Sequence, residues 1–390
     1  MSVSELEPIY DQVIAWRRAI HAYPELGFDE HKTSELVESE LRKAGIDTQR
    51  VAGTGVVGLI MGATPGKTLA LRADMDALPI EERSGEPCSS TVPGVMHACG
   101  HDAHTAMLLG AAVSLASERA RIAGNIKFIF QPAEEGPGGA KPMIDAGVLE
   151  SPRVDAAVMI HVLPLLACGV IGWRTGAMMA AADEFRLHII GRGGHAASPH
   201  LAVDTVPIAA EIVTALQRIP SREVDPLESV VLAIGTIHAG YRSNVIADRA
   251  EMTGTIRCFS ESLRATMPQR IERIVKGICE AHGARFTLAF EMGYPAAIND
   301  ARLTNLVAEV VRSTAEVAEL VELPTPRMGA EDFAYFAQAV PGCVLRLGVA
   351  APGAKDPAML HSPEFRLDER SLRTGVAVFR DLALHLPRLL

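Results

Sequence analysis

Metal-ligating side chains gather in the segment His97-Ala-Cys-Gly-His-Asp-Ala-His104, which holds three histidines, one cysteine and one aspartate. Thiolate and imidazole are good ligands for zinc, manganese and nickel-type ions. Cys99 and His101 are two residues apart, so their side chains share one side if the segment is extended. A helix cap with Asp102 in the first turn and surface histidines explains the same residues without a metal.

Two adjacent glutamates lie in Gln131-Pro-Ala-Glu134-Glu135-Gly136, directly after the apolar run from Asn125 to Phe130. Adjacent carboxylates repel each other unless a cation is close or one of them stays protonated. Beside a metal ion, one carboxylate can bind the ion while the other acts as general base toward water. A solvated acidic turn is the alternative interpretation of this pair.

Further polar residues lie at comparable places in the sequence. His161 ends the apolar run DAAVMIH, and His361 lies in LHSPEF near the C-terminus. A buried core histidine and a simple turn are the plain alternatives for these two residues. Asp76 follows the run TLALR and can orient a ligand histidine, and Asp74 can do the same or serve a turn. Because the carboxyl ends of parallel strands meet at one rim, these segments together predict a metal site there.

The elements that must position these residues alternate between helix and strand in the N-terminal part. This alternation predicts a parallel sheet with helices on both faces. The predicted helices cover residues 5–21, 31–44 and 103–117, and the predicted strands cover residues 68–72, 125–130 and 155–161.

The pattern changes after about residue 182 to the order βαββαβ, which is typical of a small ferredoxin-like α+β sandwich. Helix–strand alternation resumes after Asn299, with a helix over 301–316, a strand over 344–348 and a helix over 368–385. The sequence therefore predicts an α/β fold with a discontinuous catalytic domain, 1–181 plus 293–390, and an inserted domain, 182–292. The predicted catalytic domain has a mostly parallel sheet flanked by helices.

Bulk composition narrows the classes of partner. The chain has 390 residues, more than the roughly 250–300 at which single cores stop growing. Its formal net charge is −10 and no Lys/Arg block occurs, which argues against nucleic acid and membrane as partners. The N-terminal stretch has no apolar signal core, and no apolar run approaches membrane-spanning length. Six cysteines without a C-x-x-C pair favour reduced thiols and a cytoplasmic location.

At these motifs the sequence resembles the aminoacylase/carboxypeptidase-type dinuclear metallohydrolases. It looks closest to the amidohydrolase branch, which includes hippurate hydrolases, N-acyl-amino-acid amidohydrolases and auxin–amino-acid conjugate hydrolases. The matching segments run in order along nearly the whole chain: RRAIHAYPE (17–25), RADMDALP (72–79), HACGHDAHT (97–105), QPAEEG (131–136), IHVLP (160–164), GRGGHAASPH (191–200), GTIR (254–257), MGAEDF (328–333) and LHSPEF (360–365).

The resemblance implies two divalent metal ions per subunit, either zinc, manganese, cobalt or nickel. Carried over by position, it implies Glu134 as general base and the following metal ligands: Cys99, His101, Glu135, His161 and His361. Sister branches use a His-x-Asp ligand motif where this chain has Asp74-Met75-Asp76. That departure puts a ligand role for Asp74 in doubt and leaves Cys99 as the bridging or terminal thiolate. Asp76 is expected among the catalytic residues, as a carboxylate that orients a ligand histidine.

The resemblance also implies that the inserted domain is a lid through which the chain forms a homodimer or higher homo-oligomer. His195 would then stabilise an oxyanion, in many relatives across the dimer, while Asn244 and Arg257 would contact the substrate. A salt bridge inside the lid sheet is the simpler interpretation of Arg257. The implied activity is hydrolysis of N-acyl amino acids, hippurate-like or N-acetylated, to a carboxylic acid and a free amino acid.

Other functions use some of the same residues. An N-acetyl-diaminopimelate deacetylase and a small-peptide carboxypeptidase are the alternatives within the enzyme class. A thiol hydrolase would use Cys99 as nucleophile and a neighbouring histidine as base, but it leaves Glu135, His161 and His361 unexplained. A non-catalytic metal-binding module is the last alternative, and Glu134 argues against it because a structural site needs no spare carboxylate.

Overall fold

The computed structural model describes residues 3–390, and the chain folds into two compact units. Unit 1 comprises Met1–Met178, Ile298–Thr325 and Asp332–Leu390, and unit 2 comprises Met179–Ala297 and Pro326–Glu331. Residues 1 and 2 of the predicted catalytic domain lie outside the described part of the chain. The short piece Pro326–Glu331 belongs to unit 2, although the division made from the sequence puts it with the catalytic domain.

Unit 1 is built around one large sheet, which within the described residues has the strand order β1-β2-β4-β3-β5-β16-β6-β15. Its middle is parallel, because β4, β3, β5 and β16 pair in the same direction. The prediction of a mostly parallel sheet is confirmed. The strand bounds are β1 Asp47–Val51, β2 Gly55–Met61, β3 Thr64–Asp74, β4 Ala123–Gln131, β5 Ala156–Ala167, β6 Val170–Trp173, β15 Glu319–Glu322 and β16 Gly342–Ala350.

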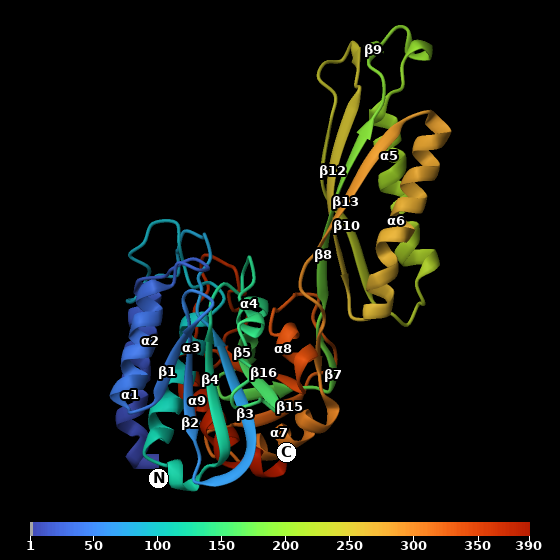
Figure 1. Cartoon of the computed structure of the whole chain (residues 1–390). Helices are drawn as coiled ribbons and strands as arrows, with labels where there is room; N and C mark the ends of the chain where they lie inside the picture. The colour runs from blue at the N-terminus through green and yellow to red at the C-terminus, as the bar shows by residue number, and fades with distance from the viewer. Residues whose placement is uncertain (1–2) are drawn as a thin grey trace. The chain divides into compact units, whose positions relative to one another are not determined.

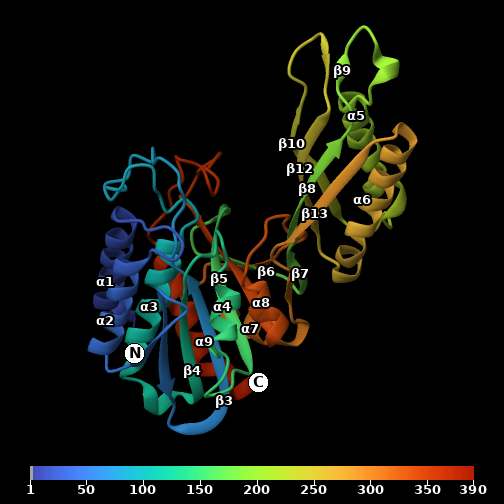
Figure 2. The same cartoon turned by 45° about the horizontal axis from the view of Figure 1, so that its top comes forward.

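Helices flank this sheet, as predicted. The buried helix α3 and the C-terminal helix α9 both pack against β3, and α1 packs against α3 (Figures 1 and 2). Almost every residue of α3 is buried because this helix is apolar on all sides. The helix bounds are α1 Val3–Ala22, α2 His31–Lys43, α3 His101–Ala116, α4 Ala140–Asp145, α7 Ala301–Arg312, α8 Ala334–Ala339 and α9 Ser371–Leu389.

Unit 2 has an antiparallel sheet in the order β10-β12-β8-β13, with two helices on one of its faces (Figure 1). Along β8, buried and exposed residues alternate, so Phe185, Leu187 and Ile189 point into a core shared with the helices. The predicted βαββαβ order is therefore present. The main bounds are β8 Ala181–Ile190, α5 Thr205–Leu216, β10 Val230–Ala239, β12 Arg249–Cys258, α6 Glu261–His282 and β13 Arg285–Met292; the short strands of unit 2 are β9 Gly194–His195 and β11 Val245–Ile246. Two further short strands, β7 Gly176–Met179 and β14 Ala297–Asn299, contain the points where the chain passes from one unit to the other.

One strand differs from its predicted length in a way that matters for the site. The sequence places His161 at a strand end, but β5 continues to Ala167. The strand continues because its residues after His161 still pair with β16, through Leu163 with Gly348 and Ala167 with Ala350. His161 therefore lies inside a strand.

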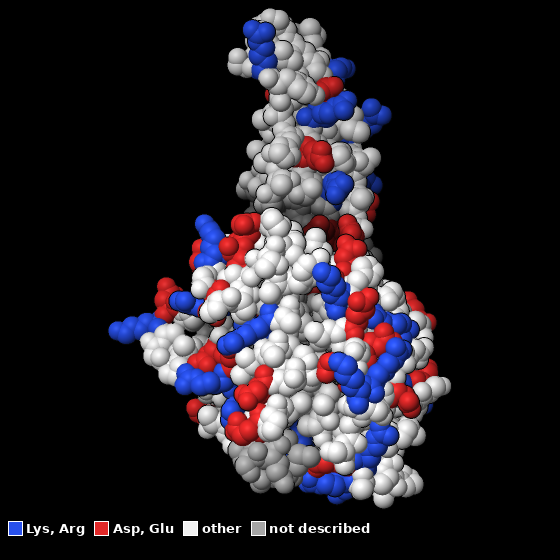
Figure 3. Space-filling model, turned by 90° about the vertical axis from the view of Figure 1, so that its left-hand side faces the viewer, with Lys and Arg blue, Asp and Glu red and all other residues white. Residues whose placement is uncertain are grey.

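The surface chemistry agrees with the composition. On the face of unit 1 drawn in Figure 3, Lys and Arg are interspersed with Asp and Glu, and no single-sign patch stands out. Among residues 3–390, the helices lack the combination of length and apolar character that crossing a bilayer requires.

Candidate metal centre and active site

Cys99 and His101 are brought together by the turn that opens helix α3. Gly100 between them has φ +82°, and a side chain at this position would lie 2.6 Å from a methyl group of Val162. Glycine is required on both counts. His101 is the first residue of α3, so the two side chains converge through a left-handed turn and not, as predicted, along an extended segment. The side-chain ligand atoms of Cys99, His101 and His161 lie within 4.8 Å of one another.

His161 reaches this cluster from β5. Its Nε2 lies 3.6 Å from Cys99 Sγ, and its Nδ1 lies 2.8 Å from the carbonyl oxygen of Val162. A carbonyl only accepts, so Nδ1 carries the proton and Nε2 presents its lone pair to the cluster. Burial, followed by the charge of Arg346, lowers the pKa of His161 well below its usual value. A neutral imidazole is the form that binds a metal ion.

The two glutamates lie on a turn after β4. Glu134 is buried, and its Oε2 is 4.0 Å from His101 Nε2. Glu134 and Glu135 form one close group of ligand atoms with His101. The buried carboxylate of Asp76 connects this turn to α3, because its Oδ2 accepts from the Glu135 backbone N–H at 2.9 Å and its Oδ1 is 3.1 Å from His101 Nδ1. Asp76 thus contacts two proposed ligands.

His361 joins from the C-terminal segment. Its backbone N–H donates to the carbonyl of Ala98 at 2.8 Å, and its Nε2 is 3.0 Å from Glu135 Oε1. Its φ is +66°, a left-handed conformation that places the imidazole beside Cys99 and Glu135. Hydrogen bonds to the Cys99 thiol and the Glu135 carboxylate raise the pKa of His361 to about 10.

The donor set fits divalent metal ions. His101 Nε2 is buried and has no hydrogen-bond partner among the described residues, although buried ring nitrogens are normally paired. It faces a Cys, His and carboxylate set of the kind that binds zinc or manganese-type ions. Burial opposes protonation of His101, but Asp74, Cys99 and Asp76 together outweigh burial and raise the pKa of His101 well above the usual value. Such an excess of negative charge favours bound cations.

A buried network behind the site joins residues that are remote from one another in the sequence. His104 Nε2 accepts from the Val162 backbone N–H at 2.9 Å, and His104 Nδ1 donates to Asp74 Oδ1 at 2.6 Å. Arg72 donates to Asp74 at 2.5 Å and to Asp332 at 2.8 Å. Asp74 is therefore committed to His104 and Arg72. The sequence did not reveal the pairing of Arg72 with Asp332 because the two residues are about 260 positions apart. Their only sequence signal is that they lie in the motif segments RADMDALP and MGAEDF.

The predicted residues of unit 2 occupy two different places. His195 in β9 pairs with Val245 in β11, and the Ala196 N–H donates to the carbonyl of Asn244, so His195 and Asn244 are neighbours. Both are exposed. Arg257 lies near the other end of β12, where its Nη1 donates to the carbonyl of Met328 at 3.4 Å. Within residues 3–390 it forms no salt bridge with an acidic side chain. The eight residue steps from 249 to 257 span about 26 Å along a strand.

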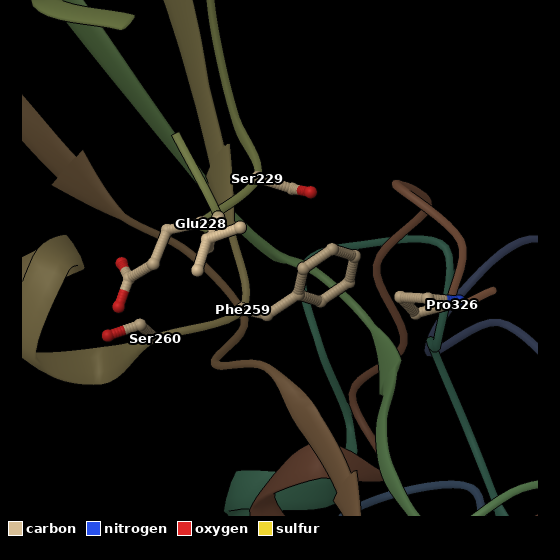
Figure 4. A pocket seen from close by; sticks show the side chains of 6 residues that line it. Glu228, Ser229, Phe259, Ser260 and Pro326 are labelled. Carbon is tan, nitrogen blue, oxygen red and sulfur yellow. The ribbon is translucent and has the colours of Figure 1, made fainter. Parts of the chain in front are cut away.

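Unit 2 also has a hollow of about 340 Å³ beside the start of α6. Figure 4 shows the ring of Phe259 between Ser229 and Pro326, with Glu228 and Ser260 pointing away from the ring. Ser260 caps α6 by accepting from the Leu263 N–H. None of the predicted site residues lines this hollow. Its lining residues are Leu227, Glu228, Ser229, Phe259, Ser260 and Pro326.

Known proteins resemble this chain over most of its length. The profile of peptidase family M20/M25/M40 matches residues 70–385. An N-acyl-L-amino acid amidohydrolase of Geobacillus stearothermophilus is 48% identical over 305 residues, which cover 77% of this chain and 82% of the relative. Thermostable carboxypeptidase 1 of Saccharolobus solfataricus is 42% identical over 98% of this chain and 97% of its own length.

A solved structure of a protein from the same family also resembles this chain. A Bacillus subtilis protein described as a dinuclear metal-binding peptidase of the M20 family superimposes with a TM-score of 0.86 at 34% identity. The match covers 98% of this chain and 100% of that one.

Proposed function

The chain belongs to peptidase family M20/M25/M40 and is a metal-dependent hydrolase of amide bonds, and we propose that it cleaves N-acyl amino acids into a carboxylic acid and a free amino acid. The observation that carries this proposal is the buried cluster in which His101 Nε2 faces Cys99, His161 and the glutamates and has no hydrogen-bond partner among the described residues. The N-acyl-L-amino acid amidohydrolase among the relatives supports this class of substrate.

We propose that two divalent ions bind in two overlapping ligand groups. One group is Cys99, His101 and His161, and the other is Cys99, Glu135 and His361, so Cys99 is common to both. The mixture of thiolate, imidazole and carboxylate suits zinc, manganese, cobalt or nickel. When bound, such ions supply Lewis acidity, which lowers the pKa of water and stabilises negative charge on a substrate oxygen.

Glu134 is the proposed general base. Its buried carboxylate lies among the proposed ligands but is not needed as one, which leaves it available to accept a proton. As water attacks the amide carbonyl, Glu134 takes one proton from that water. The C–N bond then breaks, and Glu134 gives the proton to the leaving amine, so it is regenerated with each turnover. Asp76 holds His101 and the Glu135 backbone during this cycle.

The residues of unit 2 suggest that an active site includes a second copy of the chain. We propose that His195 stabilises the oxyanion and that Asn244 and Arg257 contact the substrate. His195 and Asn244 are separated from Arg257 by about 26 Å of β12, which is longer than an N-acyl amino acid. If all three serve one substrate, they must come from two copies, and this supports a homodimer or higher homo-oligomer.

Burial weakens the alternative in which Cys99 is a nucleophile. Burial and the Glu135 carboxylate raise the pKa of the Cys99 thiol, whereas nucleophilic cysteines have a lowered pKa. A metal ion would reverse this effect, because a coordinated thiol loses its proton. All six cysteines lie within residues 3–390 and are free, and this supports the proposed cytoplasmic location.

The test is hydrolysis of a panel of substrates by the full-length chain, loaded in turn with Zn²⁺, Mn²⁺, Co²⁺ and Ni²⁺. The panel contains N-acetyl and N-benzoyl amino acids, N-acetyl-diaminopimelate and unblocked dipeptides. We expect the N-acyl amino acids to give the highest kcat/KM, and a chelator to abolish activity that added metal restores. Higher kcat/KM on dipeptides would favour a carboxypeptidase. Activity that resists chelation but not thiol alkylation would favour a Cys99 hydrolase.

A further inference from the structure

We propose that Glu30 is a positioning residue that holds the turn carrying Glu134 and Glu135 in its active conformation. This inference deepens the proposed function, on which it rests for the roles of the two glutamates. Glu30 precedes helix α2 and is completely buried. It lies more than 100 residues before the turn in sequence and outside the motifs that mark the site.

The side chain of Glu30 makes a direct contact with the turn. Its Oε1 accepts from the backbone N–H of Ala133 at 2.8 Å, and its Oε2 accepts from the hydroxyl of Thr54. Both contacts are buried, where a hydrogen bond to a carboxylate is strong and specific in geometry. Ala133 is the residue immediately before Glu134, so this contact fixes the backbone from which the proposed base projects.

The turn needs to be held because its backbone conformation is unfavourable. Ala133 has φ +52°, a left-handed conformation that residues other than glycine rarely adopt. Such conformations persist where surrounding contacts stabilise them, and they concentrate at functional sites. The Glu30 carboxylate supplies one such contact, on the N–H of the strained residue itself.

The segment before Glu30 also packs against the same turn. A side chain at Gly27 would lie 2.9 Å from both the Ala133 side chain and the Gly136 carbonyl, so the two backbones approach closely. The carbonyl of Glu25 accepts from the Ala77 N–H at 2.8 Å, next to Asp76. The segment 25–30 therefore contacts both loops that carry the proposed machinery.

Together, Glu30 and Asp76 fix the turn on both sides of the proposed base. Glu30 accepts from the N–H of Ala133, and Asp76 accepts from the N–H of Glu135. Glu134 lies between these two anchored residues. Loss of the Glu30 contact should let the left-handed turn relax, and this displaces the Glu134 and Glu135 carboxylates without removing either group.

The test compares Glu30→Ala, Glu30→Gln and Glu30→Asp with the control Glu118→Ala. Glu118 is also a buried glutamate of unit 1, but its ion pairs are with Arg380 and Arg121, which lie outside the proposed site. The readouts are kcat and KM for an N-acyl amino acid, Co²⁺ affinity by titration, and thermal unfolding. The Co²⁺ titration needs no substrate, so it decides the inference even if the wild type proves inactive on the panel.

We expect Glu30→Ala to lower kcat by about 10²-fold with little change in KM, because misplacing a reacting group by about 1 Å has this effect. Its Co²⁺ affinity should fall about 10-fold, as for other losses behind a ligand. Glu30→Gln keeps an acceptor oxygen for the Ala133 N–H and should restore both quantities nearly to wild type. Glu118→Ala should lose stability but keep the wild-type kcat and Co²⁺ affinity.

A folded Glu30→Ala that matches Glu118→Ala in both kcat and Co²⁺ affinity would overturn the positioning role. If Glu30→Ala does not fold, the comparison of Glu30→Gln with Glu30→Asp tests the positioning role instead. Glu30→Asp keeps the charge but is too short to reach Ala133, so we expect it to be impaired while Glu30→Gln is not. The opposite order would show that charge matters and the hydrogen bond does not, which also overturns this role.

Discussion

At the scale of single residues, the site depends on how each donor is oriented. The sequence pointed to the proposed ligands because most of them follow apolar runs whose ends a parallel sheet brings to one rim, and because all of them lie in motifs shared with a known family. It could not identify Arg72, Asp332 or Glu30, because their partners are remote in sequence and lie together only after folding. It also misjudged how Cys99 and His101 converge, since Gly100 turns the chain into a helix at that point.

His21 gives a prediction about pH and stability. Burial lowers its pKa, but the carboxylates of Asp102 and Glu82 outweigh burial and raise it to about 9. Because this folded-state pKa exceeds the unfolded value near 6.5, the stabilisation is complete below pH 6.5 and is lost as pH rises through 9. The shift corresponds to about 3 kcal/mol.

We therefore expect the free energy of unfolding of the wild type to exceed that of His21→Gln by less at pH 10 than at pH 6. Urea unfolding of both proteins at the two pH values measures this difference directly. A difference that stays constant with pH would show that His21 is not protonated in the folded chain.

At the scale of elements, hydrophobic periodicity predicted the main helices and strands correctly. The strands β1 and β2 were missed, because β1 is short and mostly polar and β2 follows it after a tight turn. The end of β5 was also missed, since its pairing with β16 depends on a segment about 190 residues away. Local pattern therefore predicts which segments form strands better than it predicts where long-range pairing ends them.

The packing of α3 gives a second prediction. A side chain at Gly110 would lie 2.3 Å from a methyl group of Val13 in α1, so Gly110→Ala should overpack this contact. We expect a loss of about 1–3 kcal/mol in unfolding free energy. Gly277 lies in α6, and a methyl group added there would have none of the described residues within 4 Å, so Gly277→Ala should instead gain about 0.5–1 kcal/mol.

Chemical unfolding followed by circular dichroism distinguishes the two glycines. Equal effects of the two substitutions would mean that helix propensity, and not the α1–α3 contact, determines the response.

At the scale of the whole molecule, the sequence predicted a discontinuous chain with an inserted sandwich, and the structure has two compact units. The sequence did not predict that the segment Pro326–Glu331 belongs to unit 2. There the backbone N–H of Ala180 donates to the carbonyls of Arg327 and Gly329. This placement has no local signal, because it depends on backbone hydrogen bonds between segments about 150 residues apart.

The proposed sharing of residues between copies gives a third prediction. His195→Ala and Glu134→Gln should each be nearly inactive alone, because one lacks the oxyanion donor and the other the base. Co-expression allows mixed dimers, in which one of the two sites combines an intact Glu134 with an intact His195. By this symmetry the mixture should recover about a quarter of wild-type activity. No recovery in verified mixed dimers would place His195 in the same chain as its Glu134.

The central claim is that Glu134 is the base in a metal-dependent amide hydrolysis. The most direct test measures kcat for an N-acyl amino acid in wild type and Glu134→Gln, with metal content determined for both. We predict equal metal content and a fall in kcat of about 10³-fold, within the range for loss of a general base. A Glu134→Gln protein with full metal content and kcat close to wild type would contradict the account.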